Sequence, residues 1–251
     1  MKIKQVFKIK KNSQIAQGIF SMIIYGNIAS EPIPGQFLNI KINDFYLRRP
    51  FGFCDVDLNK NEITLIYKVC GAGTLKLSGM KKGEDLDVLY NLGNGFDLKT
   101  IDANSKIVLI SGGVGLPPIY FLAKYLQENN FIFKRIDIVT GFKNFDQSFY
   151  IKEISKFGNV HVVSEDGSVG EYKGYVTNVL ERIDYDYYFA CGPLPMLKSV
   201  FYLGKSGQLS MEEKMACGFG ACMGCCTKTN VGMKRLCVEG PVLKSEEVIF
   251  D

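Results

Sequence analysis

Residues 110–118, ISGGVGLPP, decide how the middle of this chain folds. The stretch follows the apolar run KIVLIS and precedes the helical pattern PPIYFLAKYLQEN, so it connects a strand to a helix. The two prolines suit the first helical turn, where their missing N–H groups would have no partner. Gly112, Gly113 and Gly115 let the backbone approach a ligand, and the helix N-terminus suits a diphosphate. The stretch predicts a nucleotide site in an α/β unit, with a simple tight turn as the alternative.

The α/β pattern continues on both sides of this turn, over residues 100–210. Short β-branched runs alternate with helical patterns, and Ile119, Leu122, Ala123 and Leu126 follow the i, i+3, i+4, i+7 spacing of a one-sided helix. The strands are nearly continuous apolar runs, which is typical of a parallel sheet covered on both faces. We therefore expect a doubly wound parallel α/β domain.

Two further stretches end predicted strands of this sheet at the edge where open α/β folds bind ligands. NVHVVSEDG ends in Glu165 and Asp166, which could accept hydrogen bonds from ribose hydroxyls or simply form a solvated loop. YFACGPLPM places Cys191, Gly192 and Pro193 at the same edge, where the alternative is a buried cysteine before a turn.

Residues 1–99 show a different pattern, with period two. In EITLIYKV, Ile63, Leu65 and Tyr67 fall on one face, which is typical of a strand. Several such runs separated by turn residues predict a small antiparallel barrel or sandwich. Within it, RRPFGF offers Arg49 to a phosphate, and CGAGTLKLSG offers glycine N–H groups beside Thr74. For each stretch taken alone, ordinary turn chemistry is the favoured interpretation.

Residues 211–251 contain most of the chain's cysteines, and these are closely spaced. Cys217, Cys222 and Cys225 have the spacing C-x4-C-x2-C, and Cys237 follows after eleven intervening residues, which is the plant-type 2Fe-2S pattern. Structural zinc is the first alternative, although it more often shows two C-x2-C pairs, and a redox-active C-x-x-C is the second. We expect the adjacent Cys226 to be a spare thiol.

Composition excludes several classes of protein. The chain has 251 residues, 47% of them hydrophobic, and a net charge of +4 without a clustered basic stripe, so we expect no nucleic-acid partner. Lysines interrupt the first residues and no apolar run reaches the length of a membrane span, so we expect neither a signal peptide nor a membrane anchor. The thiols are then expected to stay reduced in the cytoplasm. His161 is the only histidine, which leaves a Rieske centre without its two histidines, and we expect it to pack on a strand.

Together these motifs resemble the electron-transfer subunits of type B dihydroorotate dehydrogenases. The resemblance covers essentially the whole chain and rests on RRPFG, GAGT, SGGVGLPP, ACGP and the tail EEKMACGFGACMGCCTKT with KRLCVEGPVLKSEEV. The two-domain core resembles the ferredoxin-NADP reductase superfamily, in which each motif is widespread, whereas the cysteine tail is far more restrictive.

The resemblance implies three cofactor regions: an FAD-binding barrel in residues 1–99, an NAD-binding domain in 100–210 and a 2Fe-2S domain in 211–251. The family usually has serine where this chain has Gly52, so a hydroxyl contact to the flavin ring is missing here. The implied FAD residues are Arg49, Pro50, Phe51, Gly52, Ile66, Tyr67, Lys68, Gly73 and Thr74. The NAD residues are Gly112, Gly113, Val114, Gly115, Glu165, Asp166, Cys191, Gly192 and Pro193, with Cys191 near the nicotinamide.

The resemblance also implies a partner, an FMN-containing dihydroorotate dehydrogenase catalytic subunit in a heterotetramer of two of each chain. Electrons would pass between that FMN and NAD through 2Fe-2S and FAD, in de novo pyrimidine (UMP) biosynthesis. Glu165 and Asp166, with no Arg or Lys in VVSEDGSVGE, favour NAD over NADP. Two alternatives stay open. One is a subunit serving another acceptor, as in ferredoxin:NADP oxidoreductases or sulfide dehydrogenases, and the other is a zinc-stabilised nucleotide-binding module.

Overall fold

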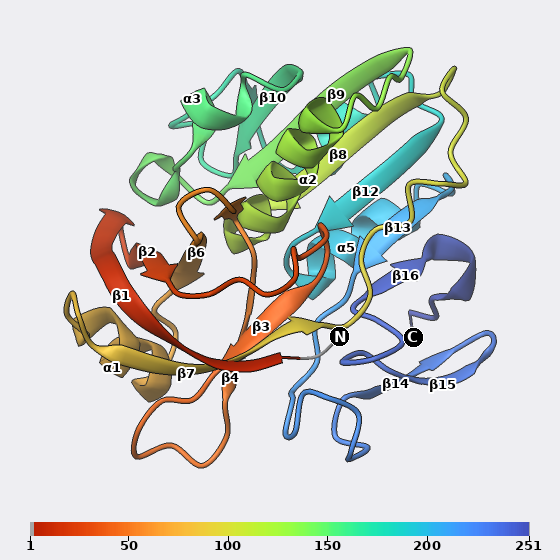
Figure 1. Cartoon of the computed structure of the whole chain (residues 1–251). Helices are drawn as coiled ribbons and strands as arrows, with labels where there is room; N and C mark the ends of the chain where they lie inside the picture. The colour runs from red at the N-terminus through yellow and green to blue at the C-terminus, as the bar shows by residue number, and fades with distance from the viewer. Residues whose placement is uncertain (1–2, 251) are drawn as a thin grey trace.

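The computed structural model describes residues 3–250 and contains two large sheets and a small hairpin (Figure 1). Residues 1 and 2 of the expected first domain and residue 251 of the expected last domain lie outside the described part of the chain. The first sheet is antiparallel, in the order β4 (Arg49–Gly52), β3 (Phe37–Ile40), β7 (Asp85–Leu92), β1 (Ile3–Ala16), β2 (Ile19–Tyr25), β6 (Glu62–Lys68) and β5 (Asp55–Asp57).

This first sheet curls into the expected barrel. Its edge strands β4 and β5 are separated by only two residues, Phe53 and Cys54, so the two edges of the sheet are drawn together. The expected inward face is confirmed, since Ile63, Leu65 and Tyr67 are buried in the barrel core. Period-two burial therefore gives the barrel one apolar interior.

The stretch CGAGTLKLSG forms a helix rather than a turn. α1 (Ala72–Gly79) begins after an extended Gly71, and Thr74 Oγ1 accepts hydrogen bonds from the N–H groups of Cys70 at 3.0 Å and Gly71 at 3.2 Å. Leu77 anchors the helix in the barrel core. The turn expected here was wrong, because the Thr74 hydroxyl binds the N–H groups that precede the helix and the barrel buries Leu77.

The second sheet is parallel apart from its last strand. Its order is β11 (Tyr172–Lys173), β10 (Asn159–Ser164), β9 (Arg135–Phe142), β8 (Lys106–Gly112), β12 (Tyr187–Cys191), β13 (Gly207–Ser210) and the antiparallel β16 (Val242–Lys244). The helical segments around it are η1 (Gly113–Gly115), α2 (Leu116–Glu128), η2 (Phe145–Gln147), α3 (Ile151–Ile154), α4 (Val176–Leu180), α5 (Leu194–Phe201) and η3 (Ser245–Glu247).

Alternate residues of β8 point to opposite faces of this sheet. Ile107 and Leu109 pack in the same core as α2 and α3, whereas Val108 and Ile110 pack with α4 and α5. Helices therefore cover both faces, and the doubly wound α/β expectation is confirmed. No helix among residues 3–250 is long and apolar enough to cross a membrane.

The C-terminal segment packs against both larger units. It contains the hairpin β14 (Cys226–Thr229) and β15 (Gly232–Arg235), then returns through β16 to the edge of the parallel sheet. Phe37 and Leu92 of the barrel share a buried core with Cys225 and Cys237. Figure 1 shows the hairpin beside β16, below the parallel sheet and next to the barrel. The cysteine segment is thus fixed against the edge where the two units meet.

Candidate functional site

The two glycine motifs of the α/β domain pack directly on each other. A Cβ on Gly115 would lie 2.1 Å from the backbone oxygen of Cys191 and 2.7 Å from the Cα of Gly192. A Cβ on Gly192 would lie 3.1 Å from the backbone nitrogen of Gly112. Only glycine permits this approach, so SGGVGLPP and ACGP form one backbone surface at the carboxyl edge of β8 and β12.

The N-terminus of α2 opens onto this surface. Proline occupies its first turn, and no acidic side chain is present there. The positive end of the helix dipole is therefore not neutralised by a carboxylate of the first turn. The short η1 helix leads into it, and the Val114 side chain between the glycines is 38% exposed. The arrangement suits an anionic dinucleotide lying across residues 112–115.

A second anion-binding arrangement lies in the barrel. Arg49 crosses Gly73, where a Cβ would meet its Nε at 3.0 Å, and its guanidinium lies 5.3 Å above the ring centre of Phe45. The neighbouring Arg48 is bound to Asp87 at 2.8 Å, whereas Arg49 pairs with no carboxylate among residues 3–250. The structure thus brings RRPFG to the N-terminus of α1, and the two offer a positive site to a diphosphate.

The predicted stretch Ile66–Lys68 divides between three environments. Tyr67 packs edge-on against Phe51 at 5.6 Å and donates a hydrogen bond to Asn12 at 3.0 Å, and burial raises its pKa to about 12. Ile66 is buried in the core shared with the α/β domain, and Lys68 is exposed. The Tyr67 side chain thus contacts the RRPFG strand.

One recess of about 230 Å³ is lined by all three parts of the chain. The barrel contributes the strand of the flavin motif, the α/β domain contributes both glycine motifs, and the segment after β13 leads into the cysteines. The lining residues are Gly35, Gln36, Phe37, Pro50, Phe51, Gly52, Val114, Pro118, Cys191, Ser210, Met211, Glu212, Glu213, Met215 and Pro241. The predicted flavin, nicotinamide and cysteine regions therefore meet at a single place.

Gly52 has a close packing partner in this recess. A Cβ there would lie 2.7 Å from Cγ of Pro118 on α2. The glycine lets the barrel strand β4 and the start of α2 approach without a side chain between them. A serine at position 52 would have to displace Pro118 before its hydroxyl could reach a flavin ring.

Two titratable groups of the recess, Cys191 and Glu212, have raised pKa values, which favour their neutral forms. Burial raises the pKa of Cys191 to about 12, with a smaller contribution from the charge of Glu212, while a hydrogen bond with Ser210 opposes the rise. Cys191 is therefore a neutral thiol. Glu212 is open to solvent at the rim, yet the surrounding protein displaces enough water that desolvation raises the pKa of its carboxyl.

Ser210 and Glu212 were missed from sequence. The sequence gives little indication of a role for either residue. Ser210 ends a short strand, and Glu212 belongs to the charged run EEK. Only the parallel pairing of β12 with β13 places Ser210 opposite Cys191.

The predicted ribose-binding acids do not line the recess. Asp166 Oδ1 accepts hydrogen bonds from the Oγ of Ser168 at 2.7 Å and from its N–H at 2.9 Å, and these bonds lower the pKa of Asp166. Glu165 is exposed next to it. Lys173 lies against Gly167, whose Cβ would meet Cδ of the lysine at 3.2 Å. A cation thus stands beside the acidic loop, although VVSEDGSVGE itself contains none.

The four predicted ligand cysteines lie in two pairs. Cys217 Sγ is 3.3 Å from Cys222 Sγ, and Cys225 and Cys237 are buried in one core, where burial and Cys225 raise the pKa of Cys237. Two pairs suit a cluster in which each of two irons takes two thiolates, whereas zinc needs all four around one point. Within residues 3–250 no three candidate ligands converge as a single ion would require.

Backbone donors favour the thiolate at the start of the cysteine loop. Burial acts to raise the pKa of Cys217, but N–H groups of Phe219, Cys222 and Ala221 outweigh it and lower that pKa to about 6. Burial and the neighbouring Cys225 raise the pKa of Cys237. N–H groups aimed at sulfur are what an anionic iron–sulfur cluster requires of its loop.

Arg235 ties the loop to the hairpin and was also missed from sequence. Its Nη1 donates to the carbonyl oxygen of Gly220 at 2.9 Å, and its Nη2 pairs with Glu239 at 2.7 Å. Cys226 points elsewhere, with its Sγ 3.9 Å from Met223 Sδ. The only sequence signal for Arg235 was a basic residue two positions before Cys237. Residue spacing alone cannot connect that residue to Gly220.

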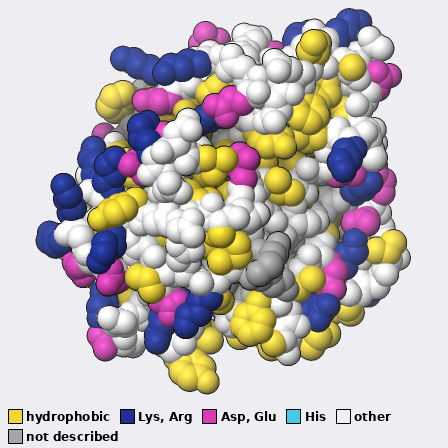
Figure 2. All heavy atoms as spheres, in the orientation of Figure 1, with side chains coloured by type: hydrophobic (Ala, Val, Ile, Leu, Met, Phe, Trp, Pro, Cys, Tyr) yellow, Lys and Arg dark blue, Asp and Glu magenta, His cyan; other side chains and the backbone are white. Residues whose placement is uncertain are grey.

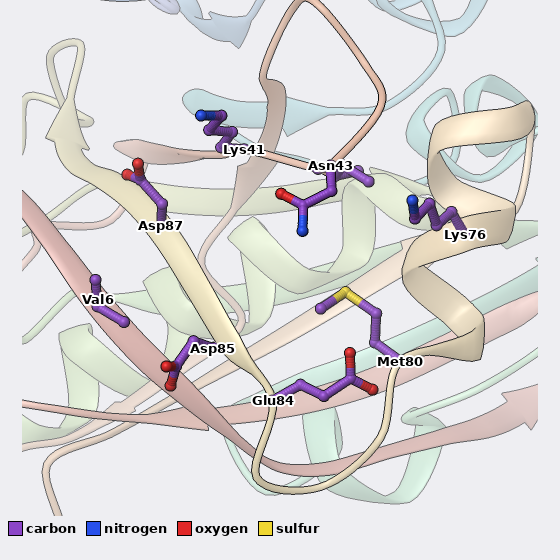
Figure 3. A pocket seen from close by; sticks show the side chains of 9 residues that line it. Val6, Lys41, Asn43, Lys76, Met80, Glu84, Asp85 and Asp87 are labelled. Carbon is purple, nitrogen blue, oxygen red and sulfur yellow. The ribbon is translucent and has the colours of Figure 1, made fainter.

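A larger recess of about 330 Å³ lies on the barrel (Figure 3). Val6, Lys41, Lys76 and several acids line it, and none is a predicted site residue. Its acids are already engaged, since Asp85 pairs with Lys8 at 2.6 Å and Asp87 with Arg48 at 2.8 Å. Figure 2 likewise shows acidic and basic side chains interspersed over the barrel face. The charged groups of this recess thus form surface ion pairs.

The remaining singled-out residues lie outside the shared recess. His161 on β10 has its Nε2 3.2 Å from Asp137 Oδ1, consistent with the expected packing role. Cys54 is buried where the barrel meets the α/β domain, and Cys70 precedes α1 and is exposed.

The fold is shared with known reductases. A structure of NADH-dependent reduced ferredoxin-NADP oxidoreductase superposes with a TM-score of 0.87 and 27% identity, covering 98% of this chain and 90% of that one. A ferredoxin NADP+ reductase from Neisseria gonorrhoeae, with bound FAD and NADP, has a TM-score of 0.69 at 12% identity, covering 79% and 89%. The fold and site define an oxidoreductase of the ferredoxin-NADP reductase type with an added cysteine-rich segment.

Sequence relatives narrow this class. Residues 212–249 match the iron-sulfur cluster binding domain of dihydroorotate dehydrogenase B. Relatives from Fusobacterium nucleatum subsp. nucleatum, 40% identical over 96% of both chains, and from Lysinibacillus sphaericus, 38% identical over 95% of this chain and 96% of the relative, are electron transfer subunits of dihydroorotate dehydrogenase B (NAD(+)). The chain belongs to this family, which confirms the resemblance seen in the sequence.

Proposed function

We propose that this chain passes electrons between NAD and the FMN of a dihydroorotate dehydrogenase catalytic subunit, through FAD and a 2Fe-2S cluster of its own. The pathway would be de novo pyrimidine (UMP) biosynthesis. FAD supplies two-electron exchange with a nicotinamide and one-electron exchange with an iron–sulfur centre, which is why it belongs between them. The single observation that carries the proposal is the recess lined jointly by Pro50–Gly52, Cys191 and Met215.

In the barrel, residues 1–99, we assign FAD to the RRPFG strand and the α1 N-terminus. Arg49 would neutralise the diphosphate from above Gly73, and N–H groups beside Thr74 would bind it. The flavin ring would lie along residues 50–52, with Tyr67 fixing that strand from behind. Ile66 would seal the ring edge against the α/β domain, and Lys68 is left to solvent.

In residues 100–210, we assign NAD to the joined glycine surface. The diphosphate would cross residues 112–115, and the nicotinamide would lie against Cys191, Gly192 and Pro193. The neutral Cys191 thiol would exclude water and contact the ring without exchanging a proton. Glu165 and Asp166 would accept from the adenosine ribose, which favours NAD over NADP.

In residues 211–251, we assign the cluster to Cys217, Cys222, Cys225 and Cys237. The N–H groups that lower the pKa of Cys217 support thiolate ligation, and Arg235 holds the loop through Gly220. Cys226 stays outside the ligand set.

The partner we propose is an FMN-containing catalytic subunit, in a heterotetramer of two of each chain, in the reducing cytoplasm. Phe219 and Met223 are exposed beside the cysteines, at 44% and 67%, and suit a protein interface there.

Reconstitution tests the proposal. The purified chain should contain flavin, iron and acid-labile sulfide, and should oxidise NADH with an artificial acceptor but leave dihydroorotate unchanged. Adding the catalytic subunit from the same source should create dihydroorotate-dependent reduction of NAD. Turnover of dihydroorotate by the lone chain, or a co-purifying mixture that gains no activity, would contradict the subunit assignment.

A different acceptor is the second candidate, because the structure with a TM-score of 0.87 is a ferredoxin-NADP oxidoreductase. Adding ferredoxin to the same mixture decides between the two acceptors. Electrons delivered to ferredoxin as fast as to the catalytic subunit would favour the second candidate.

A further inference from the structure

Asn39 is a buried polar side chain whose hydrogen bonds are missing. It lies in the middle of β3, is 1% exposed, and neither its Nδ2 nor its Oδ1 has a partner. A buried amide without hydrogen-bond partners destabilises the fold. An amide whose donor and acceptor both lack partners therefore needs an explanation, and a bound group is one. Among residues 3–250 it is the one asparagine for which both side-chain atoms are unpaired and buried.

The amide of Asn39 is aimed at the cysteine loop. A Cβ on Gly218 would lie 1.8 Å from Asn39 Nδ2, so the amide nitrogen packs against the residue that follows Cys217. Gly218 has φ of +74°, a conformation that side chains rarely adopt, and the loop turns there toward the barrel. The donor therefore comes from the barrel and lies against the residue next to the first ligand of the proposed cluster.

The same residue is adjacent to the flavin strand. In the register of the sheet, Asn39 pairs with Pro50 of β4 on one side and with Leu89 of β7 on the other. Its backbone is thus part of the RRPFG sheet, while its side chain packs against the cysteine loop at Gly218.

We propose that Asn39 Nδ2 donates a hydrogen bond to sulfur at the Cys217 side of the cluster, and that this bond raises the cluster's reduction potential. Asn39 is a positioning residue, because it fixes and tunes the cluster from the flavin-binding sheet. A donor to sulfur stabilises the more negative, reduced cluster, which is the physical reason for the direction. The inference rests on the proposed 2Fe-2S cluster.

The first test is an EPR-monitored redox titration of Asn39→Leu, which keeps the approximate shape and removes the donor. A hydrogen bond of this kind shifts the reduction equilibrium roughly tenfold, or about 59 mV for one electron, so the potential should fall by about that amount. Asn91→Leu is the matched control, since Asn91 is also buried with an unpaired Oδ1 but donates to the Ser30 carbonyl. Its cluster potential should stay at the wild-type value.

The second test uses the unaltered sequence, so it holds even if Asn39→Leu loses its cluster. Wild-type protein with 15N in the asparagine side-chain amides is reduced and examined by pulsed EPR. A weak 15N hyperfine coupling to the cluster is expected. A normal 2Fe-2S signal without that coupling, or an unchanged potential in Asn39→Leu, overturns the inference alone. Absence of any 2Fe-2S signal in wild-type protein overturns the proposed function instead.

Discussion

Gly115→Ala tests whether the two glycine motifs act as one surface. The new Cβ would lie 2.1 Å from the backbone oxygen of Cys191, whereas ordinary contact begins at 3.4 Å. The obstacle is backbone, so β12 and η1 must separate by roughly 1 Å, and overpacking of this kind costs about 1–3 kcal/mol of folding free energy. The nicotinamide surface at Cys191–Pro193 would move with it.

A displacement of about 1 Å at a reacting centre can slow the reaction on the order of 100-fold. We therefore expect flavin reduction by NADH to slow by about that factor in stopped-flow absorbance, while flavin and iron content and reduction by dithionite stay at wild-type levels. Gly79→Ala is the control, because its Cβ meets nothing within 4 Å. A Gly115→Ala protein that NADH reduces at the wild-type rate would refute the reasoning.

Three further outcomes are expected. Cys237→Ser should lose or severely weaken the cluster while keeping FAD, and Cys226→Ser should keep both; an intact cluster by iron and sulfide analysis in the first variant would refute the ligand set. NADH should reduce the flavin faster than NADPH because Glu165 and Asp166 repel a 2′-phosphate, and equal rates would show that Lys173 offsets them. Because burial raises the pKa of Cys191 to about 12, its thiol stays protonated below that pH, so the NADH reduction rate should show no thiol ionisation between about pH 6 and 9; a step near pH 8.5 that disappears in Cys191→Ala would contradict this.

Local patterns were enough to locate much of the candidate site. The glycines before α2 and the four cysteines could be found from spacing, because strand-to-helix turns and cluster loops impose their requirements on neighbouring residues. The same local reasoning failed at CGAGTLKLSG. Whether that stretch forms a turn or α1 depends on Leu77 finding the barrel core, which no neighbour in sequence reveals.

The sequence by itself determined the class of each segment: a period-two barrel, a doubly wound α/β unit and a cysteine loop with 2Fe-2S spacing. Tertiary structure alone decided what these segments form together. It placed Ser210 opposite Cys191, Glu212 in the shared recess, and the amide of Asn39 against Gly218. The physical reason is the distance between the partners along the chain. Residue spacing encodes the period of an element and its turns, whereas contacts between residues of different elements depend on how the cores pack.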